Sequence, residues 1–399
     1  MTRSWLWIIA VMLAACQTAP ETAILPTVAD LNTINTEQAA TAFAFASPTR
    51  RPLPPTFTPS PMFTATPTDP ASMPTATPQG FRSGGTVYYI FNGDAIVELA
   101  ADGSFEDLLP IPHIGQDISG LAISPDDTLL AYVAPGAGSA REVYITDRKG
   151  ANTRQVSRLG FGVVQSPVWN ADGSVLAFIA AQAPGTPMGI YTVNVDGSGQ
   201  RPVVELPSTE LQGLSWSLDG HWLFFANKEI FAVDSALGTL TEALTTFNGF
   251  GPDFSPVHSP TTSQLYYLKT EQDLQTGIRG GALSFIDTDR LPQIPAERPG
   301  ATLYVDDLEF SDDGTFLLAA GKPGIWVQVQ AMQTATKIVE NIMGAPQPTF
   351  SPDAEEVAYV NLDGLGVPQI FLIDRRGGDS TQITFHQDGT ITDLAWLAG

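Results

Sequence analysis

The sequence predicts an all-β protein that forms a single β-propeller, closed by pairing between its N-terminal and C-terminal strands. Two observations lead to this prediction. A short motif recurs six times, in which an apolar or aromatic residue precedes Ser or Asn and then a turn rich in Asp and Gly. Pieces of one further repeat stand at the two ends of the same segment. Repeats of 40 to 50 residues are typical of four-stranded propeller blades.

The first sixteen residues have the pattern of an exported protein. Arg3 supplies one positive charge before the apolar run of residues 5–15, which is far shorter than the roughly 20 residues needed to cross a bilayer. Residues 13–16 read Leu-Ala-Ala-Cys and resemble the lipobox of bacterial lipoproteins. This resemblance implies a signal peptide over residues 1–15 and a lipid on Cys16, the only cysteine of the chain. An ordinary signal peptide with a chance cysteine is the alternative.

Residues 16–84 predict a disordered tether rather than a domain. Proline alternates with Thr and Ser through much of this stretch, which removes backbone donors and favours extended, solvated conformations. A tether of this kind, starting from a lipidated Cys16, would hold the folded part outside the cytoplasmic membrane, at the bacterial cell envelope. We therefore expect the protein to contact the membrane through the lipid alone.

The charge of the chain restricts its partners. The formal net charge is -23, and residues 86–399 carry all of the excess, since acidic and basic residues balance before them. Such a surface repels phosphate backbones, so we expect no nucleic-acid partner. Cationic partners, metal ions and neutral glycans remain compatible with it. The simplest alternative is that the acidity only keeps an exported protein soluble.

Six copies of the repeat follow one another between residues 121 and 353. In each copy an inner strand ends at a Ser or Asn, a tight turn follows, and second, third and outer strands complete the blade. The Ser or Asn residues are Ser124, Asn170, Ser217, Ser255, Ser311 and Ser351. Aromatic residues recur at one inner-strand position, which predicts packing between blades rather than ligand binding. They are Trp169, Trp216, Phe254, Phe310, Phe350 and Trp396.

The chain ends supply one further blade. Residues 391–396 match the first strand of a blade, whereas residues 86–90 and 94–99 read as its later strands. Pairing between them would remove the free edge strands of an open array. Seven blades over residues 85–399 fit the sequence best, and six or eight remain alternatives because the fourth copy is irregular.

The repeats resemble those of the TolB-type propeller family. In that family a Trp-Ser-Pro-Asp-Gly strand end precedes an Ala-Phe strand and then an Ile-Tyr strand that leads to an Asp-Gly turn. Residues 214–220 here read Leu-Ser-Trp-Ser-Leu-Asp-Gly, and every copy is degenerate. The resemblance covers residues 86–399 and implies a propeller that serves as an interaction platform. It does not imply the role of TolB itself, because a tether precedes this propeller instead of that family's α/β domain.

Binding rather than catalysis is the first functional hypothesis. Loops that break the repeat would gather at one end of the propeller, and aromatic or Arg side chains there are suitable anchors for a protein, peptide or glycan. The candidate residues of this binding face are His113, Arg158, Phe161, Phe247, Phe250 and His386. Local loop packing is the alternative for each of them. We expect a monomer, and binding of this kind requires no cofactor.

The second hypothesis is a metal-assisted glycan lyase or hydrolase at the mouth of the central channel. His113 and His386 both precede an inner strand, in an arrangement that resembles propeller-type polysaccharide lyases. Asp306, Asp307 and Glu309 are weak candidate ligands for a divalent cation, since alternate residues of a strand can face the channel. No Gly-x-Ser-x-Gly elbow occurs in the sequence, so we identify no catalytic constellation and no serine hydrolase site.

Overall fold

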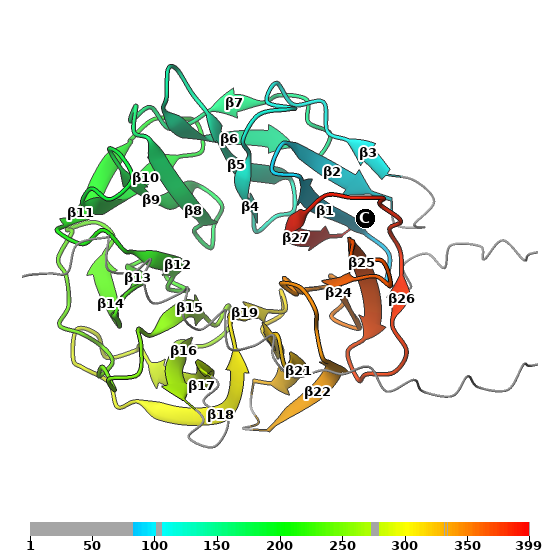
Figure 1. Cartoon of the computed structure of the whole chain (residues 1–399). Coiled ribbons are helices and arrows are strands. Elements are labelled where there is room, and N and C mark those ends of the chain that lie inside the picture. The colour runs from blue at the N-terminus through cyan, green and yellow to red at the C-terminus, as the bar shows by residue number, and fades with distance from the viewer. Residues whose placement is uncertain (1–82, 101–105, 273–278, 331, 333, 399) are drawn as a thin grey trace, which may run out of the picture. The chain divides into compact units, whose positions relative to one another are not determined.

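Seven sheets stand around a central axis as the blades of a propeller (Figure 1). The computed structural model describes residues 83–100, 106–272, 279–330, 332 and 334–398. The expected signal peptide, Cys16 and nearly all of the expected tether lie outside these residues. The prediction of an all-β propeller with seven blades is confirmed. No helix in the described ranges has the length and apolar character needed to span a membrane.

Each blade is an antiparallel sheet, and we number the blades from the one that holds both ends of the propeller. The inner strands of blades 1 to 7 are β27 (Ile391–Leu397), β4 (Ser119–Ile123), β8 (Val163–Trp169), β12 (Gln212–Trp216), β15 (Phe254–His258), β19 (Asp307–Phe310) and β23 (Thr349–Phe350). The second strands are β1 (Thr86–Phe91), β5 (Leu129–Pro135), β9 (Val175–Ala181), β13 (Trp222–Asn227), β16 (Gln264–Gln272), β20 (Phe316–Gly321) and β24 (Glu356–Leu362). The third strands are β2 (Ala95–Leu99), β6 (Arg141–Asp147), β10 (Met188–Asn194), β14 (Glu229–Asp234), β17 (Arg279–Asp287), β21 (Gly324–Val329) and β25 (Pro368–Asp374). The outer strands are β3 (Glu106–Leu108), β7 (Arg154–Gln155), β11 (Arg201–Leu206), β18 (Arg298–Val305), β22 (Ala335–Glu340) and β26 (Thr381–Gln382).

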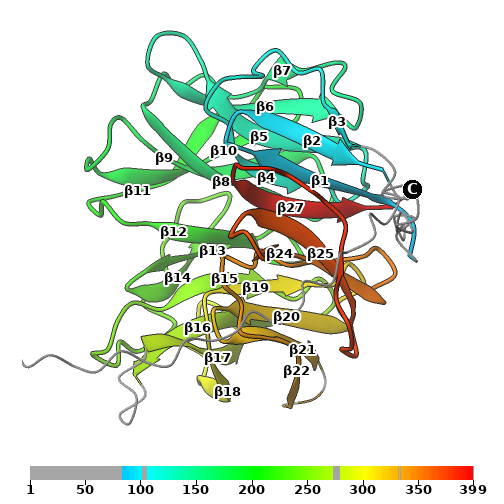
Figure 2. The ribbon, with the colours of Figure 1, turned by 45° about the vertical axis from the view of Figure 1, so that its right-hand side comes forward.

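The two ends of the propeller share blade 1. Strand β27 lies beside β1 and pairs with it antiparallel (Figure 2). In this register Trp396 lies opposite Val87. The indole nitrogen of Trp396 donates a hydrogen bond to the Gly84 carbonyl at 2.9 Å, and the side chain is 5% exposed. The predicted closure of the ring by the terminal strands is therefore confirmed.

The hydrophobic core is divided among the contacts between neighbouring blades. Seven clusters of buried side chains occur within the described residues, one at each blade-to-blade interface. The cluster between blades 7 and 1 joins Val87 and Tyr89 to Ala358 and Val360. Since the second and third strands are covered on both faces, their hydrophobicity is continuous rather than alternating, as the sequence predicts.

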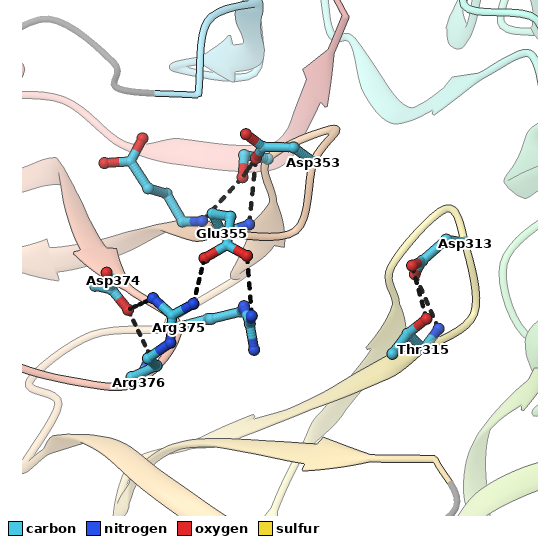
Figure 3. Close-up of polar contacts among 9 residues, drawn as sticks. Asp313, Thr315, Asp353, Glu355, Asp374, Arg375 and Arg376 are labelled. Carbon is cyan, nitrogen blue, oxygen red and sulfur yellow. Dashed lines mark hydrogen bonds and ion pairs between the residues drawn. The ribbon is translucent and has the colours of Figure 1, made fainter.

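A hydrogen-bonded turn joins the first two strands of most blades. In blade 4 the Ser217 hydroxyl donates to Asp219 Oδ1 at 2.5 Å and accepts the Trp222 N–H at 2.9 Å. The same pattern recurs in blades 2, 6 and 7. Figure 3 shows the turn aspartates of blades 6 and 7, Asp313 with Thr315 and Asp353 with Glu355. It also shows the ion pairs that Glu355 makes with Arg375 and Arg376. These aspartates stabilise turns, and the turns contain no reactive arrangement.

The expected alignment of the fourth copy at Ser255 is wrong by four residues. The turn of blade 5 is built on Ser259, whose N–H donates to the Gln264 carbonyl as the motif residues of other blades do. The sequence Phe-Ser-Pro at residues 254–256 imitates the motif, but it lies inside β15. The aromatic position of this blade is consequently held by His258, and not by Phe254 as expected.

The recurring aromatic position joins adjacent inner strands. The indole of Trp169 donates to the Ala122 carbonyl of the preceding blade at 3.2 Å, and that of Trp216 donates to the Val168 carbonyl at 3.3 Å. His258 in blade 5 is buried, and its ring stacks on Phe224 of blade 4. The prediction that this position serves packing between blades is confirmed.

A bulge recurs three residues before the aromatic position. There the register of the inner strand shifts in blades 1 to 5, and the backbone has positive φ. The residues concerned are Asp393, Gly120, Ser166, Gly213 and Ser255, and Gln347 of blade 7 also has positive φ. At Gly120 a Cβ atom would stand 2.9 Å from the Pro167 ring of the next blade, so only glycine fits this contact.

Blade 4 departs from the expected four strands. It has three, and the segment after β14 makes separate backbone and side-chain hydrogen bonds to it instead of a regular strand ladder. The hydroxyls of Thr241 and Thr245 accept the N–H groups of Ala232 and Ile230 at 3.1 and 3.0 Å. The backbone N–H groups of Thr241 and Leu244 donate to the carbonyls of Ala232 and Ile230, so the outer edge of β14 is satisfied without a fourth strand.

Deletion of residues 391–399 is expected to lower the melting temperature by about 10 °C or more, because it removes buried Trp396 and exposes the edge of β1. Thermal unfolding followed by circular dichroism measures this. Deletion of residues 398–399 is the matched control and should have little effect, since it removes a 3.3 Å bond from the Ala398 N–H and no described strand residue. Equal melting temperatures for the long deletion and the intact protein would contradict closure as a source of stability.

Candidate functional site

The strand order defines two different faces of the propeller. One face carries the connections from each outer strand to the next inner strand and the hairpins between second and third strands, and we call it the loop face. The opposite face carries the turns between first and second strands, and we call it the turn face. Function in such folds concentrates in loops held by the rigid strands.

The exposed large aromatic side chains gather on the loop face. Within the described residues they are Phe247, Phe250 and Phe385, which are 47%, 41% and 69% exposed. Phe247 and Phe250 lie in the connection from blade 4 to blade 5, as the sequence predicts for a binding face. Phe385 lies between blades 7 and 1. The sequence pattern does not single out Phe385, whereas it does single out its neighbour His386.

Arg158 and Phe161 share the connection from blade 2 to blade 3. Arg158 is exposed, and its backbone N–H donates to Gln200, which lies in the turn between β10 and β11 of blade 3. Phe161 is half-buried and meets the Tyr191 ring edge to face, with the centroids 5.9 Å apart. Phe161 also packs against the cluster between blades 2 and 3. It therefore supports the loop, while Arg158 is accessible to a partner.

The two candidate histidines lie within packing contacts. His113 is 7% exposed, its Nδ1 is 2.9 Å from the Tyr132 hydroxyl, and burial lowers its pKa. His386 stacks on Phe91 and has its Nε2 3.2 Å from the Tyr89 hydroxyl. Each histidine packs on equivalent strands of its own blade, so the structure does not bring the pair together around shared ligands.

The acidic residues of blade 6 do line the central channel in part. Leu308 is buried between blades, whereas Asp307 on one side of it is exposed and Glu309 on the other is partly exposed. This is the alternation that the sequence predicts. Across the described part of the chain, however, no group of three or more His, Cys, Asp or Glu side chains could hold a metal ion.

Protein atoms surround the carboxyl groups of Asp307 and Glu309, although both residues are also accessible to water. Burial inside the channel raises the pKa of Asp307 to about 6 and that of Glu309 to about 8. Glu309 accepts a hydrogen bond from the Thr349 hydroxyl at 2.8 Å, which partly offsets this effect. At neutral pH Glu309 is therefore largely protonated and a poor ligand for a cation. Asp306, next to them, has its pKa raised by the same cause.

Glu309→Gln should make stability less sensitive to pH. The folded state binds the Glu309 proton more tightly than the unfolded state, so stability is lost as the pH rises from about 4.5 to about 8. We expect the variant to lose about 1–2 kcal/mol less than the native protein between pH 5 and pH 8, after allowance for solvent screening. Urea denaturation at both pH values measures the difference.

The control is Asp353→Asn, because hydrogen bonds in its turn lower the pKa of Asp353 below its usual value despite partial burial. That group titrates below the tested interval, so this variant should keep the native dependence. An unchanged loss of stability in Glu309→Gln would contradict the raised pKa.

A cavity of about 490 Å³ opens on the loop face of blade 4. It lies between the connections that enter and leave this blade, beside the segment where the fourth strand is missing. Its walls include Phe247 and Pro252 from the connection to blade 5 and Ala226 from β13. The charged residues that line it are Glu210, Lys228, Glu229 and Asp253. The volume lies within the range of ligand sites.

Asp253 is the most unusual residue of this cavity. Its side chain is 1% exposed, and burial raises its pKa to about 6. One carboxylate oxygen, Oδ2, accepts the Thr245 hydroxyl at 2.6 Å. The other oxygen, Oδ1, has no hydrogen-bond partner among the described residues. Sequence analysis missed this residue because the misaligned fourth copy placed it inside a repeat motif.

A second hollow, of about 670 Å³, lies at the turn-face mouth of the channel. All seven inner strands or their turns line it, among them Trp169, Trp216, Glu309 and Trp396. The aromatic side chains that line this hollow pack between blades. For this reason we place the candidate binding site on the loop face, at Phe247, Phe250 and the adjacent cavity.

Comparisons with known proteins support the fold and are weak in sequence. The chain matches no protein-family model. A segment of 100 residues is 27% identical to the uncharacterized peptidase YuxL of Bacillus subtilis (strain 168), and this match covers 25% of the chain and only 14% of that peptidase.

Three solved structures show the same architecture at low identity. Oligogalacturonate lyase in complex with manganese has a TM-score of 0.59 at 16% identity, over 74% of this chain and 87% of that one. A prolyl endopeptidase has a TM-score of 0.51 at 14% identity, over 81% and 53% of the two chains. TolB from Acinetobacter baumannii has a TM-score of 0.50 at 13% identity, over 79% and 67%. The chain is thus a β-propeller structurally similar to the propellers of TolB and prolyl endopeptidases.

Proposed function

We propose that this protein is a binding module that holds a protein or peptide on the loop face of its propeller. The observation that carries the proposal is that Phe247, Phe250 and Phe385 are exposed on this single face. Exposed aromatic side chains are typical anchors of binding sites, because they bury much apolar area with little loss of side-chain freedom.

The spread of these anchors favours a macromolecular partner over a small molecule. Phe385 precedes blade 1, while Phe247 and Phe250 precede blade 5, so the anchors stand in well-separated connections of the ring. A glycan remains a second kind of occupant for the cavity alone. We favour binding over the metal-assisted lyase or hydrolase, because His113 and His386 each pack on a tyrosine of their own blade.

We further propose that the module works outside the cytoplasmic membrane of a bacterium, held there by a lipid on Cys16 and a Pro/Thr-rich tether. The basis is the sequence of residues 1–84, with its lipobox-like end and its proline-rich composition. A tether would leave the propeller free to orient its loop face toward a partner.

The double variant Phe247→Ser and Phe250→Ser should weaken binding of selected peptides by about 100-fold, the combined effect expected for loss of two aromatic anchors. A peptide display library selected on the native chain supplies the ligands, and fluorescence anisotropy measures their affinity. Leu237→Ser is the matched control, because Leu237 is 79% exposed but lies on the turn face. If the selected peptides bind the double variant normally but do not bind Leu237→Ser, the binding site does not lie on the loop face.

Cys16→Ser should move the exported protein from the membrane fraction to the soluble fraction, because a single thioether carries the anchor. Fractionation of cells that express each form measures the distribution, and labelling with a radioactive fatty acid measures acylation. Native protein should incorporate the label and the variant should not. Membrane retention of the variant would count against the anchor.

A further inference from the structure

We propose that the blade 4 cavity receives a basic side chain, lysine or arginine, of the bound peptide, and that the buried Asp253 in its wall attracts the charged group. This inference rests on the proposed function, since it names the kind of residue that the loop face recognises. Four observations support it: an unpaired buried carboxylate oxygen, the charges around it, the apolar walls and the placement beside the exposed phenylalanines.

The unpaired oxygen is the first observation. Asp253 lines the cavity with a side chain that is 1% exposed, and Oδ1 has no hydrogen-bond partner in the described residues. A buried carboxylate without a full set of donors destabilises the folded state, so native structures rarely retain one without a reason. A cation in the adjacent cavity would stabilise the charge of this buried carboxylate.

The neighbouring charges compensate Asp253 only in part. Lys269 lies close enough to lower its pKa, but the Lys269 ammonium pairs with Glu297 Oε2 at 2.5 Å. Glu297 in turn accepts the Tyr267 hydroxyl at 2.8 Å and the Thr246 N–H at 2.7 Å. The lysine is thus held by a separate, fully bonded group and does not neutralise the cavity.

The lining of the cavity has more negative than positive charge. Glu210, Glu229 and Asp253 contribute carboxyl groups, against the one ammonium of Lys228. Glu229 accepts the Phe247 N–H at 3.2 Å, which holds an aromatic wall beside a carboxylate. In a site that excludes water such a charge balance favours cations and disfavours carboxylates or phosphates.

The apolar walls suit the stem of a long basic side chain. Phe247, Pro252 and Ala226 line the cavity, and lysine or arginine would lay its methylene groups along them. The ring of Phe247 also offers a π face to a cation. A neutral sugar would satisfy Asp253 through a hydroxyl, but it would gain nothing from the negative charge of the lining.

The pH dependence of such binding follows from the groups that face Asp253. Burial raises the pKa of Asp253 to about 6, the Thr245 hydroxyl and Lys269 act to lower it, and Glu297 and Glu229 act to raise it. The carboxyl group is therefore ionised above pH 6 and protonated below it. A cationic ligand should bind well at pH 8 and poorly at pH 5.

The test uses Nα-acetyl-lysine amide and its uncharged isostere Nα-acetyl-norleucine amide, titrated into the full chain at pH 8 and followed by ligand-observed NMR. We expect the lysine compound to bind at least tenfold more tightly than the norleucine compound. This preference should be lost at pH 5 and in Asp253→Asn, which keeps an acceptor for Thr245. It should be kept in Asp353→Asn, a substitution in a turn-face loop of blade 7.

Equal binding of the two compounds to the native chain at pH 8 overturns the inference, and this comparison holds even if Asp253→Asn does not fold. Retention of the preference in a folded Asp253→Asn protein overturns it as well. If the lysine preference is absent while selected peptides still depend on Phe247 and Phe250, the inference falls and the proposed function stands. If the lysine preference is present but the selected peptides bind the Phe247 and Phe250 double variant normally, the inference stands and the proposed function falls.

Discussion

The pairing of β27 with β1 is the interaction on which the rest of the structure depends. Each blade buries its two faces only against its neighbours, and the described core consists of seven clusters that each join two blades. In an open array the first and last blades would expose one face and an edge strand to water. Because the C-terminal strand becomes the inner strand of the N-terminal blade, the cluster around Val87 and Trp396 is as complete as the others. The loops of the loop face owe their fixed relative positions to this closure.

The recurring bulge explains how seven inner strands fit around one axis. A bulge increases the local twist of a strand, and here it recurs at one position with positive φ in most blades. Residues at this position also connect blades: the Gln347 amide oxygen accepts the Asp393 N–H at 2.7 Å, and Gly120 lies against Pro167. Blade 6 is the exception, where Asp307 continues a regular ladder. The inner strands thus serve closure of the ring and packing between blades.

Features that follow the repeat period could be predicted from the sequence, and features that break it could not. Trp169 and Trp216 recur at equal positions, so their role between blades was readable without coordinates. The fourth copy was misread because Ser255 and Pro256 imitate a motif that Ser259 actually supplies. The same misalignment leaves Asp253 without a predicted role. Its burial and its unpaired Oδ1 depend on the path of the loop, which the repeat pattern does not predict. The burial of His113 is not predictable from the sequence either, because only the fold places this residue against Tyr132.

The missing fourth strand of blade 4 links the fold to the candidate site. The Thr245 hydroxyl accepts the Ile230 N–H and donates to Asp253 Oδ2, and the hydroxyls of Ser157 and Thr384 accept third-strand N–H groups in the same way in blades 2 and 7. The carboxylate that lines the cavity therefore also fixes the segment that replaces the strand. The exposed Phe247 and Phe250 lie in the same connection, between Thr245 and Asp253, so this hydrogen bond fixes both ends of the short segment that carries them.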